Sequence, residues 1–201
     1  EQAGKTIHVQ NQGSEPIGVL AYARDFSIDR EGNFVFSEPG HASYSAARWL
    51  SLEESNFELL PGEGKEVEVV VSVPAEVEPG GHYAVLFFEA VPQGNQSAVS
   101  VSMRIPALFY VTVLGAIGVG VFANAEIVSL QLPKIANRGP VGMAVVVRNS
   151  GNVHLTVAAR AHFAASWGNA TELDLGQVVI LPNSNGVLRG EWHRLPFVGK
   201  V

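Results

Sequence analysis

The chain has no cysteine among its 201 residues, which excludes disulfide bonds, thiolate metal sites and cysteine nucleophiles. Basic residues are also few: 13 Lys and Arg stand against 19 Asp and Glu, for a net charge of −6. This balance argues against nucleic-acid binding, because phosphate recognition needs a basic face. Helical periodicity is nearly absent, and the best helix candidate is the short segment 42–50. Residues 1–5 lack the basic start and apolar stretch of a signal peptide.

Strand-forming runs separated by turn residues are abundant, and this pattern is typical of a β-sandwich. In the clearest run, Val67, Val69, Val71 and Val73 alternate with Glu66, Glu68 and Ser72, which predicts a half-buried strand ended by Pro74. Gly32 closes a predicted tight turn that needs positive φ. Strands are expected at 5–11, 17–26, 33–36, 49–52, 66–73, 82–91, 98–113, 126–132, 143–149, 155–163, 172–179 and 187–192.

The order of turn residues occurs twice. Asn11-Gln-Gly13, Leu60-Pro61-Gly62 and Pro79-Gly80-Gly81 are followed later by Asn149-Ser-Gly151, Leu181-Pro182-Asn183 and Pro196-Phe-Val-Gly199. Such a repeat predicts an all-β chain of two tandem immunoglobulin-like β-sandwiches, at 1–115 and 121–201. The first copy continues for two long strands after its last glycines, whereas the second has two residues left. The second sandwich is therefore expected to be incomplete at its C-terminus, with an open edge that pairs with another chain or with further native sequence.

The segment Ile105–Ala125 carries no charge and is long enough to cross a bilayer as a helix. Its composition favours another reading, because Pro106 opens the segment, Phe109–Val113 is strand-forming and three glycines weaken a helix. We expect a strand followed by an interdomain connector, with a membrane helix as the alternative.

Several segments of the first domain form a recurrent pattern: Trp49–Leu52, Phe57–Gly62, Val69–Ala75 and Glu78–Phe88. This pattern resembles the first domain of a bacterial surface family, the WxL-interacting proteins. Asn11–Gly13 with Ile17–Val19 is similar to that family's opening strand pair, Asp29–Phe34 to its hairpin and Arg104–Gly115 to its final strand. The segments Val147–His154 and Val179–Ser184 resemble its second, immunoglobulin-like domain. A more distant resemblance is to the amino-terminal domain of periplasmic pilus chaperones.

The resemblance implies a secreted bacterial protein, exposed at the cell surface and tethered by a single C-terminal helix that this chain lacks. It also implies peptidoglycan or another cell-wall polymer, or a surface protein, as the partner. Pilus chaperones grip a partner's terminal carboxylate with basic residues, so by analogy Arg104 and Arg24 become candidate binding residues.

No pattern predicts catalysis, a metal site or a cofactor. The six histidines are scattered; His154 and His162 would lie roughly 26 Å apart along a strand, too far for one ion. Asp25, Asp29 and Glu31 do not have calcium-loop spacing, so turn capping is preferred over weak cation binding. Nucleophile-elbow and phosphate-loop motifs are absent. Trp167 has a loop-like setting in which its ring could stack on a sugar, whereas Trp49 is expected in the core.

These observations give three functional hypotheses. The first is a non-enzymatic extracellular adhesion module. The second is a chaperone-like module that binds partner strands by β-augmentation, for which the apolar strand Leu108–Val113, with Tyr110, would be the distinguishing feature. The third, a carbohydrate-active enzyme, needs two carboxylates about 5–10 Å apart in a cleft, and no spacing predicts them.

Overall fold

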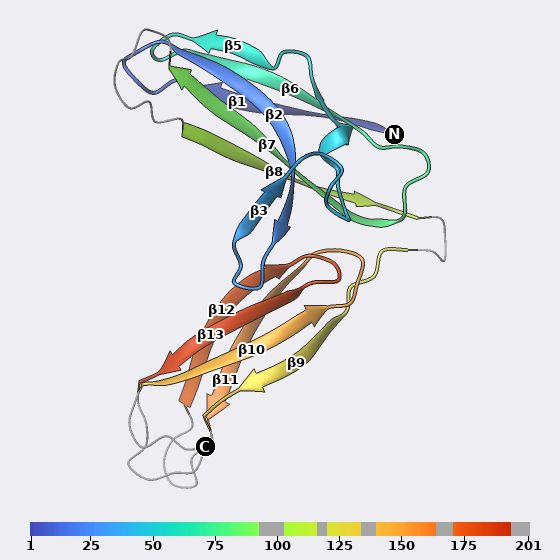
Figure 1. Ribbon diagram of the computed structural model, residues 1–201, viewed down its shortest axis with the longest axis vertical. Helices are drawn as coiled ribbons and strands as arrows, with labels where there is room; N and C mark the ends of the chain where they lie inside the picture. The colour runs from blue at the N-terminus through green and yellow to red at the C-terminus, as the bar shows by residue number, and fades with distance from the viewer. Residues whose placement is uncertain (93–102, 116–119, 134–139, 164–170, 194–201) are drawn as a thin grey trace. The chain divides into compact units, whose positions relative to one another are not determined.

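The computed structural model describes residues 1–92, 103–115, 120–133, 140–163 and 171–193. These residues form strands and a single 3₁₀ turn, so the predicted all-β class is confirmed (Figure 1). The elements are β1 (Gln2–Gln10), β2 (Ile17–Ile28), β3 (Phe34–Ser37), η1 (Ala47–Trp49), β4 (Leu50–Leu52), β5 (Asn56–Leu59), β6 (Gly64–Ser72), β7 (Gly80–Pro92), β8 (Met103–Val113), β9 (Ala125–Gln131), β10 (Val141–Asn149), β11 (Leu155–Phe163), β12 (Thr171–Ile180) and β13 (Asn185–Trp192).

The chain divides into two compact units. The first consists of Glu1–Phe26 with Phe36–Gly115, and the second of Ser27–Val35 with Ala116–Val201. No helix in the described ranges is long and apolar enough to cross a membrane, and the first part of the uncharged segment 105–125 lies in β8.

The first unit is a sandwich of two sheets. One sheet has the strand order β1-β6-β4; the other has the order β3-β2-β7-β8, with β5 paired to the start of β2 (Figure 1). The alternation predicted for β6 is confirmed, since Val67, Val69 and Val71 are buried while Glu66 and Glu68 are exposed. Val67 and Val69 meet side chains of the facing sheet in a core that includes Val19, Ala21, Phe57, Leu59, Leu86 and Phe88.

The second unit has the sheet β13-β10-β9 and a two-stranded sheet, β11-β12. Its core contains Met143, Val147, Leu175, Ile180 and Leu188. Within the described part of the chain, β11 is hydrogen-bonded to β12 alone.

The sequence repeat is visible in the hydrogen bonds of Asn11. This buried side chain donates from Nδ2 to the carbonyls of Glu15 (2.8 Å) and Leu59 (3.0 Å). Its Oδ1 accepts the N–H of Gly13 at 2.9 Å. The amide thereby joins the end of β1 to the start of β2 and the end of β5.

Asn149 makes the same three bonds in the second unit. Its Nδ2 donates to the carbonyls of Val153 (2.7 Å) and Ile180 (2.9 Å), and its Oδ1 accepts the N–H of Gly151 at 2.9 Å. Strands β1, β2, β5 and β6 therefore correspond to β10, β11, β12 and β13. The strand pairing agrees, because β1 pairs with β6 as β10 pairs with β13, and β2 with β5 as β11 with β12.

The Leu-Pro turns correspond as well. Gly62 has a φ of 78° and Asn183, at the same place in the second turn, has a φ of 56°. Both turns need the left-handed region, which glycine enters freely and asparagine tolerates better than other residues. The third repeated motif falls in residues 194–201 in the second copy and lies outside the described residues.

The best helix candidate, 42–50, does not form an α-helix. Only the 3₁₀ turn Ala47–Trp49 forms, and the N–H groups of Gly40, His41 and Ala42 donate to the carboxylate of Asp25 (2.8, 2.9 and 3.0 Å). These donors hold the segment as a loop against the sheet. Trp49, expected in the core, is half-buried with its ring 4.6 Å from that of His82.

Candidate functional site

Strand β8 is an edge strand with apolar side chains on both faces. It pairs antiparallel with β7 from Ala90↔Met103 to Gly80↔Val113, without a bulge, and has no second neighbour among the described strands. Pro106 lies inside it, and a proline is accepted in a sheet where its nitrogen points away from the neighbouring strand. Leu108 is two residues further along the strand, so its N–H group then also points away from β7.

Two apolar residues near the start of β8 face the core side of the sheet but are uncovered. Ile105 lies opposite the buried Phe88, and opposite residues of an antiparallel pair project from the same face. Even so, Met103 is 65% exposed and Ile105 is 63% exposed. Further along, Ala107, Phe109 and Val111 pack against the core of the first unit.

The other face of this sheet carries aromatic rings from β2, β3, β7 and β8. Tyr110 contacts Phe26 and Tyr83 edge-on, with ring centroids 5.9 and 5.6 Å apart. Phe87 contacts Phe36 at 4.9 Å and Tyr22 at 5.6 Å. Burial among these rings raises the pKa of the Tyr110 phenol above its ordinary value.

Arg104 lies at the edge of this aromatic face. Its guanidinium carbon is 4.7 Å from the centre of the Phe87 ring and 5.8 Å from that of Phe36. The side chain is exposed, and none of the carboxylates that the structure describes lies within ion-pair distance of it. Arg104 is thus a cation positioned on rings, with donors available to an anion.

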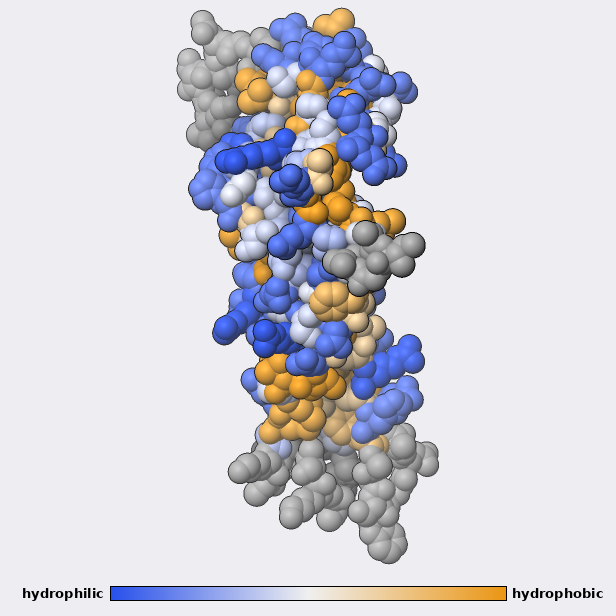
Figure 2. All heavy atoms as spheres, turned by 90° about the vertical axis from the view of Figure 1, so that its right-hand side faces the viewer, coloured by the Kyte–Doolittle hydropathy of each residue, from blue (hydrophilic) through white to orange (hydrophobic). Residues whose placement is uncertain are grey.

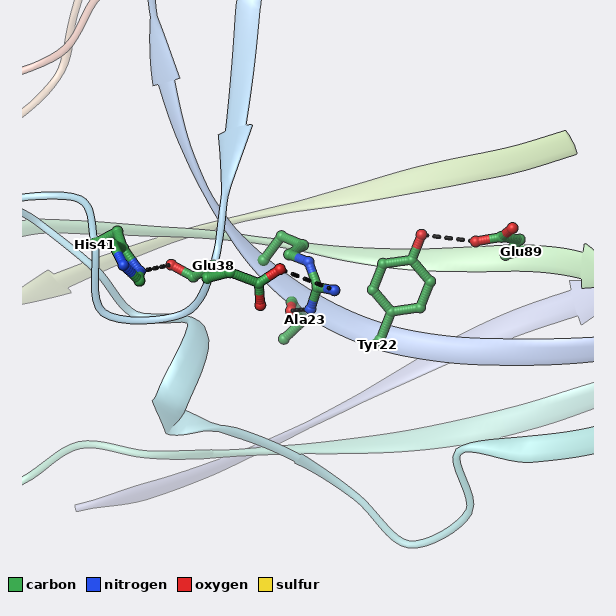
Figure 3. A network of polar contacts seen from close by, with 6 residues as sticks. Tyr22, Ala23, Glu38, His41 and Glu89 are labelled. Carbon is green, nitrogen blue, oxygen red and sulfur yellow. Dashed lines mark hydrogen bonds and ion pairs between the residues drawn. The ribbon is translucent and has the colours of Figure 1, made fainter. Parts of the chain in front are cut away.

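Arg24 is on the same face but is already engaged by Glu38, Ala23 and Tyr22, which Figure 3 labels. Its guanidinium lies 3.4 Å from the Glu38 carboxylate, donates to the Ala23 carbonyl at 3.1 Å and stacks 4.8 Å from the Tyr22 ring. The Tyr22 hydroxyl in turn donates to Glu89 at 2.7 Å. Of the two arginines suggested by the sequence, Arg104 is the one without a carboxylate partner in the described structure.

The remaining candidates are not part of this site. Asp25 is fully buried and anchors the loop 40–45, since it also accepts the Ser45 hydroxyl at 2.5 Å. Asp29 accepts the side-chain and backbone N–H groups of Asn33, which lower its pKa. In the described ranges no group of three metal-ligating side chains comes together. Trp167 lies outside the described residues.

The sequence did not indicate that Tyr22, Phe36 and Phe87 would surround the two arginines. These rings come from three strands, and only the sheet order brings them together. The sequence offered only the alternation of side chains along each strand, which predicts the sheet face on which a side chain lies but not the side chains beside it.

No protein-family model matches the chain, and no curated protein sequence is significantly similar to it. Solved structures are similar in fold. A chain of a chaperone–tip adhesin complex of CFA/I fimbriae biogenesis is 14% identical, with a TM-score of 0.54 over 99% of this chain and 90% of that one.

Two further structures are similar at the same level. The class 5 fimbriae chaperone CfaA is 15% identical, with a TM-score of 0.52 over 96% of this chain and 87% of its own. A chain of the CsuC–CsuE chaperone–tip adhesion subunit pre-assembly complex of Acinetobacter baumannii is 13% identical, with a TM-score of 0.51 over 96% and 82%. At this identity the likeness shows the fold alone.

Proposed function

We propose that the chain is a non-enzymatic binding module that pairs an extended strand of another protein with the free edge of β8. The observation that carries this proposal is an eleven-residue edge strand that pairs with β7 in continuous register and exposes apolar side chains. Proteins ordinarily protect such edges with lysines, bulges or a covering segment, because unpaired backbone groups accept a further strand. Here Arg104 is the single charge in the strand.

Strand addition would use both the backbone edge of β8 and its exposed side chains. The outward N–H and C=O groups of its free edge would extend the sheet by one strand, and alternate side chains of the partner would contact the exposed Met103, Ile105 and Leu108. Arg104 would bind an acidic group of the partner, such as a terminal carboxylate, because its guanidinium is exposed and held on two rings.

The comparisons support this reading over adhesion to a wall polymer. Two of the similar chains come from complexes of a chaperone with a tip adhesin or tip adhesion subunit, so proteins of this fold occur in complexes with another protein. By the same analogy we propose a location outside the cytoplasm. The assignment to the WxL-interacting family, with its wall-polymer partner and membrane anchor, rests on the sequence resemblance.

The proposal is tested with synthetic strands. Fluorescent peptides with alternating apolar and polar residues, each with a scrambled peptide of the same composition, are titrated against the full chain by anisotropy. Three proteins are compared: the wild type, Leu108→Ala, which shortens one side chain, and Leu108→Pro, which also removes an outward N–H. Because one or two kcal/mol corresponds to a factor of 5–30, we expect Leu108→Pro to weaken binding by about tenfold and Leu108→Ala by less.

Circular dichroism of each variant controls for folding, and hydrogen exchange of the wild type shows where the peptide binds. Protection at residues 103–113 on peptide binding supports the proposal. Equal binding of alternating and scrambled peptides, or equal affinity of Leu108→Pro and the wild type, would overturn it.

A further inference from the structure

Two opposite charges face each other on β7 and β8 without forming an ion pair. Glu89 is the direct register partner of Arg104 in the antiparallel pairing of these strands. Side chains of such partners project from the same face of the sheet, with β-carbons about 5 Å apart, so opposite charges in these positions ordinarily attract each other. Within the described residues, however, no ion pair joins Glu89 to Arg104. A further contact on this face therefore holds the two side chains apart.

The hydroxyl of Tyr22 provides that contact. It donates to the Glu89 carboxylate at 2.7 Å, as Figure 3 shows, from β2, which lies on the side of β7 opposite to β8. The Arg104 guanidinium lies instead over the ring of Phe87, two residues before Glu89 in β7, at 4.7 Å. The hydrogen bond thus directs the carboxylate toward β2 and away from the strand that carries the arginine.

Arg104 belongs to a part of the chain with a large excess of carboxylates. Residues 1–115 contain 15 Asp and Glu but six Lys and Arg. Hydrophilic side chains cover much of the first unit on the side shown in Figure 2, where this unit is the upper part. Every Asp and Glu of the sequence lies in the described ranges, so no side-chain carboxylate outside them neutralises Arg104. In such surroundings a surface guanidinium is expected to attract the nearest carboxylate, which here is restrained.

We propose that Tyr22 is a positioning residue, which holds Glu89 on the β2 side and thereby keeps Arg104 available to a carboxylate of the bound partner. The inference rests on the proposed function, in which Arg104 binds an acidic group, and it identifies the residues that control that contact. Without the hydroxyl, Glu89 would turn to the guanidinium directly opposite. A partner's carboxylate would then have to displace Glu89 before it could bind.

The ring of Tyr22 has a separate structural role. It contacts the ring of Phe87, with centroids 5.6 Å apart, and carries the Arg24 guanidinium at 4.8 Å. Phenylalanine keeps the ring and removes the hydroxyl, so Tyr22→Phe isolates the hydrogen bond to Glu89. Glu89→Gln removes the charge that this hydrogen bond restrains. If the effect of Tyr22→Phe comes from the freed carboxylate, the double variant should behave as the wild type does.

A first measurement needs no partner. The full-length wild type, Tyr22→Phe, Glu89→Gln and the double variant are treated with phenylglyoxal, and peptide mass spectrometry gives the modification rate of each arginine. Because an ion-paired guanidinium is less reactive, we expect Tyr22→Phe to slow modification of Arg104 about two- to fivefold, and the double variant to restore the rate. Arg48, an exposed arginine of the same unit, is the internal reference. Glu38→Gln, which removes the carboxylate partner of Arg24, is the control and should leave the Arg104 rate unchanged.

A second measurement uses the alternating peptide of the previous section in three forms. One has a C-terminal carboxylate, one a C-terminal amide, and one an amide that follows a terminal glutamate. Tyr22→Phe should weaken binding of the carboxylate form about two- to fivefold and leave the plain amide form unchanged, and the double variant should restore the affinity. The glutamate form shows whether a side-chain carboxylate serves as well as a terminal one.

An Arg104 rate that is the same in the wild type and in Tyr22→Phe would overturn the inference. A slower rate that persists in the double variant, or equal weakening of all peptide forms, would do so as well. If the Arg104 rate responds as expected but no peptide binds through β8, the control of Arg104 by Tyr22 stands and the proposed function fails. If peptides bind in a manner that depends on Leu108 but neither measurement responds to Tyr22→Phe, the inference fails and the proposed function stands.

Discussion

The paired asparagines allow one quantitative test of the structure. Asn11 and Asn149 are buried, and each makes three hydrogen bonds to backbone groups of different strands. Replacement by alanine removes about 1 kcal/mol of net stabilisation per bond and leaves two carbonyls and one N–H without that partner. We therefore expect Asn11→Ala and Asn149→Ala each to lower the free energy of unfolding of its own unit by about 3–5 kcal/mol.

A loss of this size is a large part of the stability of a domain, which is ordinarily about 5–15 kcal/mol. Thermal unfolding followed by circular dichroism should show a fall in Tm of more than about 10 °C for domains of this size. Peptide-resolved hydrogen exchange would assign the loss, with faster exchange in the first unit for Asn11→Ala and in the second for Asn149→Ala. Asn56→Ala, at an exposed position in β5, is the control and should stay within about 0.5 kcal/mol of the wild type.

Two results would refute the reasoning. If both alanine variants unfold within 1 kcal/mol of the wild type, the amides do not hold the strands together. If one variant loses the expected stability and the other does not, the two hydrogen-bond sets are not equivalent, and the correspondence of β2 with β11 loses its support.

Three further predictions concern single residues. Asp25→Asn should destabilise the first unit and speed amide exchange at 40–42, because an NH₂ group would replace an oxygen that accepts three N–H groups; exchange unchanged from the wild type would contradict this. Burial raises the pKa of the Tyr110 phenol, so the absorbance difference between the wild type and Tyr110→Phe should titrate with a midpoint above pH 10. The contribution of this phenol to the free energy of unfolding is then present below pH 10 and is lost as the pH rises through the pKa of the folded state. Gly62→Ala should cost about 1–2 kcal/mol of unfolding free energy, because Gly62 has a positive φ of 78°; a Tm unchanged from the wild type would argue against this turn geometry.

The local features of the fold were predictable from the sequence. The alternation of β6 indicated its buried face, and the glycine of the 29–32 turn has the expected positive φ, 90° at Gly32. The repeated Asn-x-Gly motif indicated two similar units because one buried amide recurs in the same role. Each of these signals lies within a few residues of the feature it predicts.

Features set by distant residues were missed. The helix candidate 42–50 contains only a 3₁₀ turn, and the N–H groups of Gly40, His41 and Ala42, before it and at its start, donate to Asp25, a residue at least fifteen positions away. Strand β5 was not among the expected strands, since four residues carry little alternation and its pairing with β2 decides its conformation. Arg24 was expected to be available to a partner, and its own chain supplies Glu38. In each case the deciding contact joins residues that no local pattern connects.

The two copies of the repeat also show what decides exposure in a β-sandwich. The sequence Val-x-Ala-x-Ala occurs in β2 from Val19 and in β11 from Val157, so composition and alternation are the same. The difference in burial then comes from the neighbouring strand, which is β7 in the first unit and absent from the described residues beside β11. The half-buried state of Val157 and Ala159 therefore follows from the sheet neighbours described for β11 and not from the choice of side chains. The same reasoning applies to the uncovered core face of β8, where Met103 and Ile105 are exposed and the strand has no second neighbour among the described strands.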